Sequence, residues 1–448
     1  MNTNAHQRNS EPTRRQFLRT STAAAAGLSL TDAATAAASK SLALHGGSKA
    51  VTVPHGDAAK WPLYGKEEEE VVLDIMRNPG RGGIYRELPR IEKAWKEYYK
   101  VDYAKSHCNG TSALTSMFFA LKKDLPPGSE IMVPSYTFFA TIVPMRIFDF
   151  VPVFVDTDPR TMNFDLEDAK KRLTKHTKAV LPVHFWGLPC EMDHICDWAK
   201  EKGLIVVEDA AHAHGTYLKG KPLGTWGVMS IFSFQGSKPL PALEGGMGMY
   251  MEREYYERAA AFGHYQAPPT FPKDSPYHKF GGTGLALKLR MHPLAAALAR
   301  VQLTKLDERN KKGNKQVRSL NDRLKGLPGL SEPVCRPDCQ RLYYDLNMLF
   351  IDEAKAGMSR AACLKALKAE GVQARPGNYA LQHKYALFSD ASYWHHKPHV
   401  PDVLPGSEQV NRTSIALPYF TSDVPELVEQ YVTAFEKVWA NRNQLAKT

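Results

Sequence analysis

The sequence predicts an α/β protein whose core is a largely parallel sheet covered by helices on both faces. From residue 101 onward, short apolar runs typical of buried strands alternate with segments of helical spacing. The apolar runs are continuous rather than alternating with polar residues, which is typical of parallel strands buried on both faces. The expected strands cover residues 101–106, 131–134, 151–156, 179–183, 204–209, 228–234 and, later in the chain, 343–351.

Helices are expected between these strands and near both ends of the chain. Four glutamates at 67–70 precede an apolar run, and carboxylates favour the first turn of a helix. In residues 88–99, Ile91, Trp95 and Tyr98 recur at helical spacing. Further helices are expected from Asn109 to Leu121 and over residues 137–148, 165–173, 192–202, 294–311, 359–370 and 424–444.

Length and composition suit a globular protein of two domains, or of one large domain with an appended lobe. The chain has 448 residues, of which 43% are hydrophobic and 10% aromatic. Of the formal charge of +11, residues 1–38 carry +2, and the remaining +9 is spread along the chain. No arginine-rich arm or zinc-finger spacing occurs, so a nucleic-acid partner is not indicated. The basic bias suits anionic small substrates.

The first 38 residues have the pattern of a twin-arginine export signal. Residues 13–19 read Thr-Arg-Arg-Gln-Phe-Leu-Arg, an alanine-rich run follows, and three alanines precede Ser39. The apolar run is too short for a permanent membrane anchor. We therefore expect a periplasmic or otherwise extracytoplasmic protein, and a cytoplasmic one where the signal is not used. A disordered alanine-rich tail is the alternative.

The cysteines are too sparse for a disulfide framework. Cys335 and Cys339 are spaced for either a disulfide or half of a metal site, and Cys190, His194 and Cys196 offer another ligand set. No second Cys/His pair with familiar spacing accompanies either group, so no metal site is predicted. The six cysteines are Cys108, Cys190, Cys196, Cys335, Cys339 and Cys363.

Lys238 lies between two apolar runs. It follows the strand expected at 228–234 and the residues Gln-Gly-Ser, and a turn rich in Pro and Gly comes after it. Burial lowers the pKa of a lysine, which makes the amine nucleophilic near neutral pH and able to form a Schiff base. The alternative is a surface lysine in a loop.

Other polar residues follow the predicted strands, at the edge where α/β proteins bind ligands. Asn109 to Ser112 open a helix, which makes either an anion site or an ordinary helix cap. Asp209 ends a strand, where a buried carboxylate holds a heterocyclic nitrogen protonated; a solvated or helix-capping Asp is the alternative. Ser233 is a phosphate donor or a small strand residue, and Phe138 a ring stacker or a core residue.

Together, phosphate donors, a ring stacker, a carboxylate and a lysine favour pyridoxal phosphate as cofactor. Competing signatures are absent from the sequence: it has no P-loop, no HExxH, no GxSxG and no dinucleotide-binding glycine motif after a first strand.

In these motifs the chain resembles the DegT/StrS-type family of pyridoxal-phosphate-dependent sugar aminotransferases, within fold type I. The resemblance spans about residues 42–440 and is strongest over 101–250. Its motifs are Asn-Gly-Thr-Ser-Ala-Leu at 109–114, Val-Pro-Ser-Tyr-Thr-Phe-Phe-Ala-Thr at 133–141, Pro-Val-Phe-Val-Asp at 152–156, Glu-Asp-Ala-Ala-His at 208–212, Phe-Ser-Phe-Gln-Gly-Ser-Lys at 232–238 and Glu-Gly-Gly at 244–246.

The resemblance implies a role for each site residue. Lys238 forms the Schiff base with the cofactor and acts as general base and acid, and Asp209 contacts the pyridine nitrogen. His212 lies near the ring and Phe138 stacks on it. The residues about the phosphate are Gly110, Thr111, Ser112 and Ser233. One departure is Lys288, which precedes Arg290 where family members carry an Asn that reaches the partner subunit's phosphate.

The resemblance also implies the architecture and the reaction. We expect a large domain over residues 39–293, a linking helix with a smaller α/β domain over 294–448, and a homodimer. The expected reaction moves an amino group from an amino acid, glutamate, to a keto sugar or a related carbonyl compound. One alternative is a sugar dehydratase on the same fold, whose members carry His in place of the lysine. The other is an exported carbohydrate-binding protein without turnover.

Overall fold

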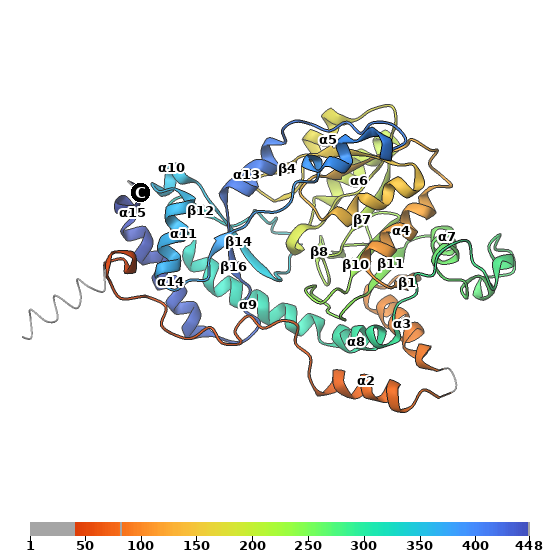
Figure 1. The fold of residues 1–448 in the computed structure, drawn as a ribbon, viewed down its shortest axis with the longest axis horizontal. Helices are drawn as coiled ribbons and strands as arrows, with labels where there is room; N and C mark the ends of the chain where they lie inside the picture. Colours follow the sequence, from red (N-terminus) through yellow and green to blue (C-terminus); the bar gives the residue numbers. More distant parts are fainter. Residues whose placement is uncertain (1–40, 81–82, 447–448) are drawn as a thin grey trace, which may run out of the picture.

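The computed structural model describes residues 41–80 and 83–446, and the predicted signal peptide lies outside these ranges. Figure 1 shows two bodies of secondary structure connected by the successive helices α8 (Pro293–Thr304) and α9 (Leu306–Leu324). None of the helices within the described ranges is long and apolar enough to cross a membrane.

The larger body is built on a mostly parallel sheet, as the sequence predicts. Its seven strands, counted over the described residues, stand in the order β1-β11-β10-β7-β6-β2-β3. All neighbours from β10 to β3 pair in parallel, and β11 runs antiparallel to both β10 and β1. In chain order the strands are β1 (Tyr103–His107), β2 (Glu130–Pro134), β3 (Val151–Val155), β6 (Thr177–Val180), β7 (Ile205–Asp209), β10 (Met229–Ser233) and β11 (Gly246–Tyr250).

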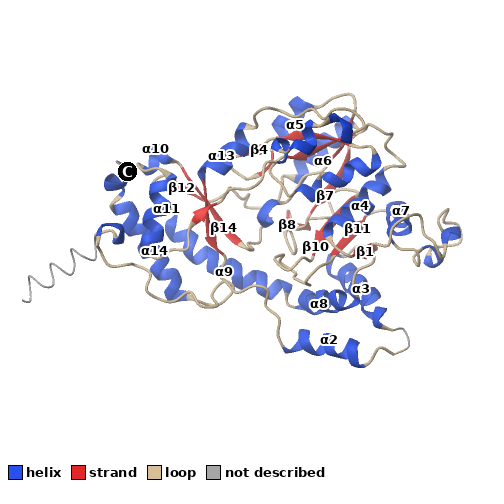
Figure 2. Cartoon of the chain, viewed as in Figure 1, coloured by secondary structure: helices blue, strands red, loops and turns tan. Residues whose placement is uncertain are grey.

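Helices cover both faces of this sheet because its strands are apolar on both sides (Figure 2). Neighbouring residues of a strand point to opposite faces, so Val206 and Val207 enter different cores. One face packs against α3 (Glu87–Tyr99), α5 (Leu166–Arg172), α6 (Met192–Lys202) and α8, and the other against α4 (Gly110–Leu121), α7 (Arg253–Gly263) and η4 (Val143–Phe148). Helix α2 (Lys66–Arg77) packs on α8.

The smaller body has an antiparallel sheet, ordered β12-β14-β16-β15. Leu42 and Val51, from the start of the described chain, pack into its core beside the C-terminal helices, while the domain boundary at residue 293 stays a prediction. The elements of this body are β12 (Leu330–Ser331), β14 (Leu346–Ile351), β15 (Arg375–Pro376), β16 (Ser414–Pro418), α9, α10 (Glu353–Ala356), α11 (Arg360–Ala369), α14 (Pro425–Ala440) and α15 (Arg442–Leu445).

Two segments from the C-terminal part of the chain return to the larger body and reach the edge of its sheet. Leu342 N–H donates to Gly187 O at 3.1 Å, and Gln382 N–H donates to Ser135 O at 3.0 Å. The connecting elements are β4 (Thr157–Asp158), β5 (Asn163–Phe164), β8 (Tyr217–Leu218), β9 (Lys221–Pro222), β13 (Cys339–Gln340), α12 (Ala386–Ser389) and α13 (Pro405–Thr413).

Three expected helices differ from those of the structure. Residues 137–148 form two 3-10 turns, η3 (Phe139–Thr141) and η4, because Pro144 has no N–H to donate to an α-helical bond. The helix expected at 294–311 is interrupted at Lys305, which separates α8 from α9. The helix expected at 424–444 is interrupted at Asn441, which caps α14.

The remaining short elements are 3-10 turns in the connections. They are η1 (Ala43–His45), η2 (Ile84–Arg86), η5 (Phe185–Gly187), η6 (Pro268–Thr270), η7 (His278–Phe280), η8 (Gln382–Lys384) and η9 (Ala391–Tyr393). Of these turns, η5 and η8 belong to the segments that approach the carboxyl ends of the parallel strands.

Candidate active site

A cavity of about 520 Å³ lies at the carboxyl ends of the parallel strands, where ligands bind in this class of sheet. Most of its wall comes from the larger body, and part comes from the two returning C-terminal segments. It is lined by Asn109, Gly110, Thr111, Leu114, Thr137, Phe138, Phe139, Ala140, Thr141, Val183, Trp186, Asp209, Ala211, His212, Ile231, Ser233, Gln235, Ser237, Lys238, Glu244, Tyr344, Asp345 and Tyr379.

Lys238 is presented to this cavity by the loop between β10 and β11. Backbone hydrogen bonds across the loop, from Gly236 N–H to Leu243 O and from Ala242 N–H to Phe234 O, hold it closed. Lys238 N–H donates to Gln235 O at 2.8 Å, which fixes the start of the side chain. Burial lowers the pKa of the lysine from 10.5 to about 8, against the opposing charges of Asp209 and Asp345. The amine therefore loses its proton at a lower pH than an exposed lysine does.

His212 holds the lysine amine in place. Trp186 N–H donates to His212 Nδ1 at 3.3 Å, so the neutral ring carries its proton on Nε2. This Nε2 lies 2.7 Å from Lys238 Nζ. Burial and the nearby Lys238 lower the pKa of His212 well below 6.5, which keeps the imidazole neutral. The imidazole N–H thus donates to the lysine in its neutral amine form.

Asp209 is a buried carboxyl at the end of β7. Its Oδ2 accepts from Thr141 Oγ1 at 2.7 Å, and its Oδ1 accepts from Ala211 N–H at 3.0 Å. Burial raises the pKa of Asp209, and these two hydrogen bonds with the charge of Lys238 oppose the rise. A buried carboxylate oriented in this way favours a protonated nitrogen on a ligand that lies against it.

The start of α4 lies beside Ser233 and presents a helix N-terminus, which is suited to bind an anion. Asn109 caps the helix by accepting from Ser112 N–H at 2.8 Å, while the N–H groups of Gly110 and Thr111 belong to the first helical turn, which has no partners within the helix. A Cβ added to Gly110 would lie 3.1 Å from Ser233 Cβ, so helix and strand approach closely there. A Cβ added to Gly246 would lie 2.7 Å from the Asn109 backbone.

The structure separates Ser112 and Lys288 from the other expected site residues. Ser112 Oγ lies 2.9 Å from Cys108 Sγ, and Ser112 serves the helix cap rather than the cavity wall. Lys288 lines a different cavity, of about 180 Å³, with Arg290 and Tyr265. The residues brought together in the 520 Å³ cavity are Gly110, Thr111, Phe138, Asp209, His212, Ser233 and Lys238.

Four aromatic and acidic residues of the wall carry no signal in their local sequence. Trp186 stacks on His212 with ring centroids 5.6 Å apart, and its backbone takes the left-handed conformation (φ 49°). Tyr344 lies under Lys238, whose Nζ is 5.9 Å from the ring centroid. Asp345 also has a positive φ (59°), and burial raises the pKa of its carboxyl. Tyr379 enters from the segment before η8.

These donors fit pyridoxal phosphate. The start of α4 with Ser233 suits a phosphate, Asp209 suits a pyridine nitrogen, Phe138 offers a half-exposed ring, and Lys238 offers an amine of lowered pKa for an aldehyde. Fold and site together define a fold-type I, pyridoxal-phosphate-dependent transferase.

Comparison with known proteins gives the family. Residues 62–436 match the model of the DegT/DnrJ/EryC1/StrS aminotransferase family, so the chain belongs to that family and is a pyridoxal-phosphate-dependent aminotransferase. This confirms the resemblance, the fold class and the cofactor expected from the sequence.

Three relatives illustrate the similarity. The chain is 33% identical over 320 residues to the spore coat polysaccharide biosynthesis protein SpsC of Bacillus subtilis (strain 168), covering 69% of this chain and 79% of that protein. It is 33% identical over 248 residues to the GDP-perosamine synthase of Escherichia coli O157:H7, covering 55% and 65%. The solved structure of DesI in the presence of its TDP-sugar product has a TM-score of 0.71 and 26% identity, covering 91% and 99%.

The sequence allowed the cysteines to form a disulfide or to bind a metal. All six cysteines are free thiols. Within the described ranges, no group of three or more His, Cys, Asp or Glu side chains is arranged to hold a metal ion. Cys190 Sγ donates instead to Val183 O at 3.1 Å, and Cys190 belongs to the core on the sheet face that packs against α3, α5, α6 and α8.

Proposed function

We propose that this aminotransferase moves an amino group from an amino acid, glutamate, to a keto sugar, with Lys238 as the residue that holds the cofactor and carries the proton. The observation that carries the proposal is the pairing of Lys238 Nζ with His212 Nε2 at 2.7 Å inside a cavity that also contains Asp209 and the start of α4.

Each residue has a task in this proposal. Gly110 and Thr111 N–H groups and Ser233 Oγ hold the phosphate, and Phe138 covers one face of the ring. Asp209, oriented by Thr141, keeps the pyridine nitrogen protonated. Pyridoxal phosphate, when bound, supplies the electron sink for the charge left as the donor's α-proton departs.

Lys238 Nζ is the group that removes this α-proton. Its pKa of about 8 lies near neutral pH, where a base both takes and returns a proton efficiently. His212, neutral and fixed by Trp186 N–H, orients the amine by donating from Nε2. Tyr344 and Trp186 enclose this pair and limit the access of water.

A keto sugar is supported as the acceptor by the names of the relatives. They include a GDP-perosamine synthase, a polysaccharide biosynthesis protein and an enzyme solved with its TDP-sugar product. A cavity of about 520 Å³ is within the size range of sites for ligands of this kind. A carboxylate wall residue, Asp345, suits the hydroxyl groups of a sugar.

Three further expectations belong to this proposal. The enzyme is a homodimer, and Lys288, exposed in its own small cavity, serves the partner subunit's phosphate as a point charge in place of an amide. It is exported as a folded protein by the twin-arginine route. The signal over residues 1–38 supports the export, and the family resemblance supports the dimer.

The test is an amino-donor screen on the purified enzyme. With glutamate or glutamine, the bound cofactor should convert to its amine form, and the visible absorbance of the lysine-bound form should fall. A keto-sugar nucleotide should restore that absorbance while an amino sugar appears. Loss of a sugar hydroxyl without amine transfer would establish the dehydratase instead, and an unchanged spectrum with every donor would establish a binding protein.

A further inference from the structure

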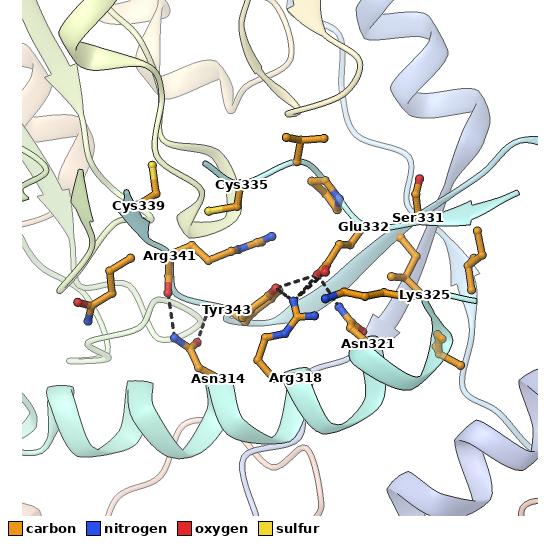
Figure 3. A pocket seen from close by; sticks show the side chains of 16 residues that line it. Asn314, Arg318, Asn321, Lys325, Ser331, Glu332, Cys335, Cys339, Arg341 and Tyr343 are labelled. Atoms are coloured by element: carbon orange, nitrogen blue, oxygen red, sulfur yellow. Dashed lines mark hydrogen bonds and ion pairs between the residues drawn. The ribbon is translucent and has the colours of Figure 1, made fainter. Parts of the chain in front are cut away.

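Another cavity, of about 660 Å³, lies between α9 and the chain from β12 to β13 (Figure 3). It is separate from the Lys238 cavity, and its lining shares no residue with it. Its polar wall includes two cysteines and three cations. The residues labelled in Figure 3 are Asn314, Arg318, Asn321, Lys325, Ser331, Glu332, Cys335, Cys339, Arg341 and Tyr343.

Two of the three cations are neutralised by carboxylates. Arg318 pairs with Glu332 at 2.6 Å and also with Asp322. Lys325 pairs with Asp322 at 2.7 Å. Both side chains therefore serve the structure of α9 and its neighbour and leave no free charge to the cavity.

Arg341 is the cation that lacks such a partner. Its guanidinium stacks on the Tyr343 ring, with Cζ 3.9 Å from the centroid. Nε and Nη1 are buried, and neither has a hydrogen-bond acceptor among the described residues. Because a buried donor without an acceptor is costly, this guanidinium is placed for an anion that neutral side chains do not provide.

Two cysteines, Cys335 and Cys339, line the same cavity as Arg341, and a thiolate is an anion. Cys339 closes a turn by donating its N–H to Arg336 O at 3.1 Å, which folds Cys339 back toward Cys335, and both thiols line the same cavity. Both side chains are half-buried, and both also line a third cavity of about 480 Å³, so small molecules reach them. In Figure 3 the side chain of Arg341 lies below that of Cys335.

The charges around Cys335 favour its thiolate. The hydrogen bond from Cys339, followed by Arg341, lowers the pKa of Cys335 from 9.0 to about 7, against burial and the carboxylates of Glu332 and Asp338. The pKa of Cys339 is raised because its proton is held in the hydrogen bond to Cys335, with burial acting in the same direction. The charge of Arg341 thus favours Cys335 as the attacking thiol.

We propose that Cys335 and Cys339 form a redox-active dithiol, with Cys335 as the attacking thiolate, Arg341 as its positioning cation and low-molecular-weight disulfides as the oxidant. The Cys335 thiolate attacks one sulfur of the small disulfide, whose S–S bond breaks, and the first small thiol leaves with a proton. Cys339 then loses its proton and attacks Cys335 Sγ, and the second small thiol leaves. The two cysteines give up two electrons, and the small disulfide gains them.

The two cysteines lie on the segment that continues into the lining of the Lys238 cavity. Leu342, next to Arg341, bonds to Gly187 beside Trp186, and the following residues Tyr344 and Asp345 line the Lys238 cavity. The proposal concerns only the chemistry of the two thiols, so it stands or falls separately from the proposed aminotransferase substrate.

The test uses the reduced, full-length enzyme with its cofactor, exposed to oxidised glutathione at pH 7. Alkylation and peptide mapping should show Cys335 and Cys339 disappearing together as a disulfide, while buried Cys190 and Cys363 stay free. Cys339→Ser should stop at a stable mixed disulfide on Cys335, and Cys335→Ser should leave Cys339 largely unreacted. Both cysteines remaining free thiols in the folded wild-type enzyme would overturn the proposal.

A second measurement, the pH dependence of Cys335 alkylation, tests the effect of the Arg341 guanidinium alone. The rate of Cys335 alkylation should rise with pH around a midpoint near 7, and Arg341→Gln should move that midpoint toward the ordinary 9.0. Lys325→Gln is the matched control, because this cation lines the same cavity but is already paired with Asp322, and it should leave the midpoint in place. Equal midpoints in wild type and Arg341→Gln would show that Arg341 has no such role.

Discussion

The two cavities each hold a nucleophilic side chain with a lowered pKa, and the causes differ. Burial lowers the pKa of Lys238 to about 8, although Asp209 and Asp345 oppose the change. A hydrogen bond from Cys339 and the charge of Arg341 lower the pKa of Cys335 to about 7, although burial opposes it. Burial therefore acts in opposite directions at the two sites, since it penalises an ammonium and a thiolate alike.

Because burial has opposite effects on the two nucleophiles, the two sites need different surroundings. A lysine becomes nucleophilic when the fold encloses it, so Lys238 depends on segments from the whole chain: β7, the β10–β11 loop and the C-terminal returns. A cysteine needs charged or hydrogen-bonding neighbours, and Cys335 obtains them within six residues, from Cys339 and Arg341. The residues of the Lys238 site are far apart in the sequence, whereas Cys335, Cys339 and Arg341 lie on one short segment.

The largest effect is expected from removing the catalytic amine. Lys238→Ala should lower kcat for amino transfer by about 10³-fold or more, because both the covalent attachment and the proton carrier are lost. Steady-state rates with glutamate as donor measure this. Lys221→Ala, which removes a cation that lies over the Trp226 ring outside the cavity, is the matched control and should retain activity.

A smaller loss is expected from Asp209→Asn, which keeps the shape but removes the charge that favours a protonated ring nitrogen. Activity should fall by about 10²-fold, as for loss of a positioned acid–base group. Thr141→Val removes the 2.7 Å hydrogen bond to Asp209 and should cost about 10-fold, the equivalent of one buried hydrogen bond. Equal activity of Asp209→Asn and wild type would remove Asp209 from the mechanism.

Close packing behind the anion site is tested with Gly246→Ala. The new Cβ would lie 2.7 Å from backbone atoms of Asn109, so β11 or the start of α4 must move, at a cost of about 1–3 kcal/mol in the free energy of unfolding. Urea unfolding with and without cofactor measures this, and cofactor affinity should fall as well. Gly236→Ala, whose Cβ meets only Leu243 O at 3.8 Å, is the control; equal losses in both variants would contradict the packing argument.

The smallest expected effect is on the pH at which each nucleophile becomes reactive. This pH can be compared directly between Lys238 and Cys335. In cofactor-free enzyme, modification of Lys238 by an amine reagent should accelerate as pH rises through about 8 rather than 10.5. Asp345→Asn removes a carboxylate that favours the ammonium, so the midpoint should move below that of wild type. Arg341→Gln moves the Cys335 midpoint the other way. A rise in the Lys238 midpoint on Asp345→Asn would contradict the electrostatics.

Sequence reasoning predicted the parts of the site that follow strands in order along the chain. Asp209 ends β7, Ser233 ends β10 and Lys238 follows in the next loop, so local pattern and topology suffice to place them at one edge of the sheet. The mostly parallel sheet and the helices α6 and α11 were likewise predictable, since their apolar spacing and caps are local.

The site residues that the sequence did not predict depend on contacts between distant segments. Trp186, Tyr344 and Asp345 join the wall because the chain after α9 returns to Gly187, and no local pattern specifies that return. The backbone N–H of Ser112 donates to the Asn109 cap and its Oγ lies 2.9 Å from Cys108 Sγ, so a phosphate contact of Ser112 stays a prediction. Cys335, Cys339 and Arg341 are close in sequence, but the cavity that they share is closed by α9, which the local sequence does not show.

The central claim is that Lys238 carries the cofactor. Borohydride reduction of the purified holoenzyme, followed by peptide mapping, tests it most directly. Reduction fixes the cofactor on the nitrogen to which it is bound. The phosphopyridoxyl group should be found on the peptide containing Lys238 and be absent from the Lys238→Ala variant. A label on another lysine, or no label on an enzyme that retains bound cofactor and activity, would contradict the assignment.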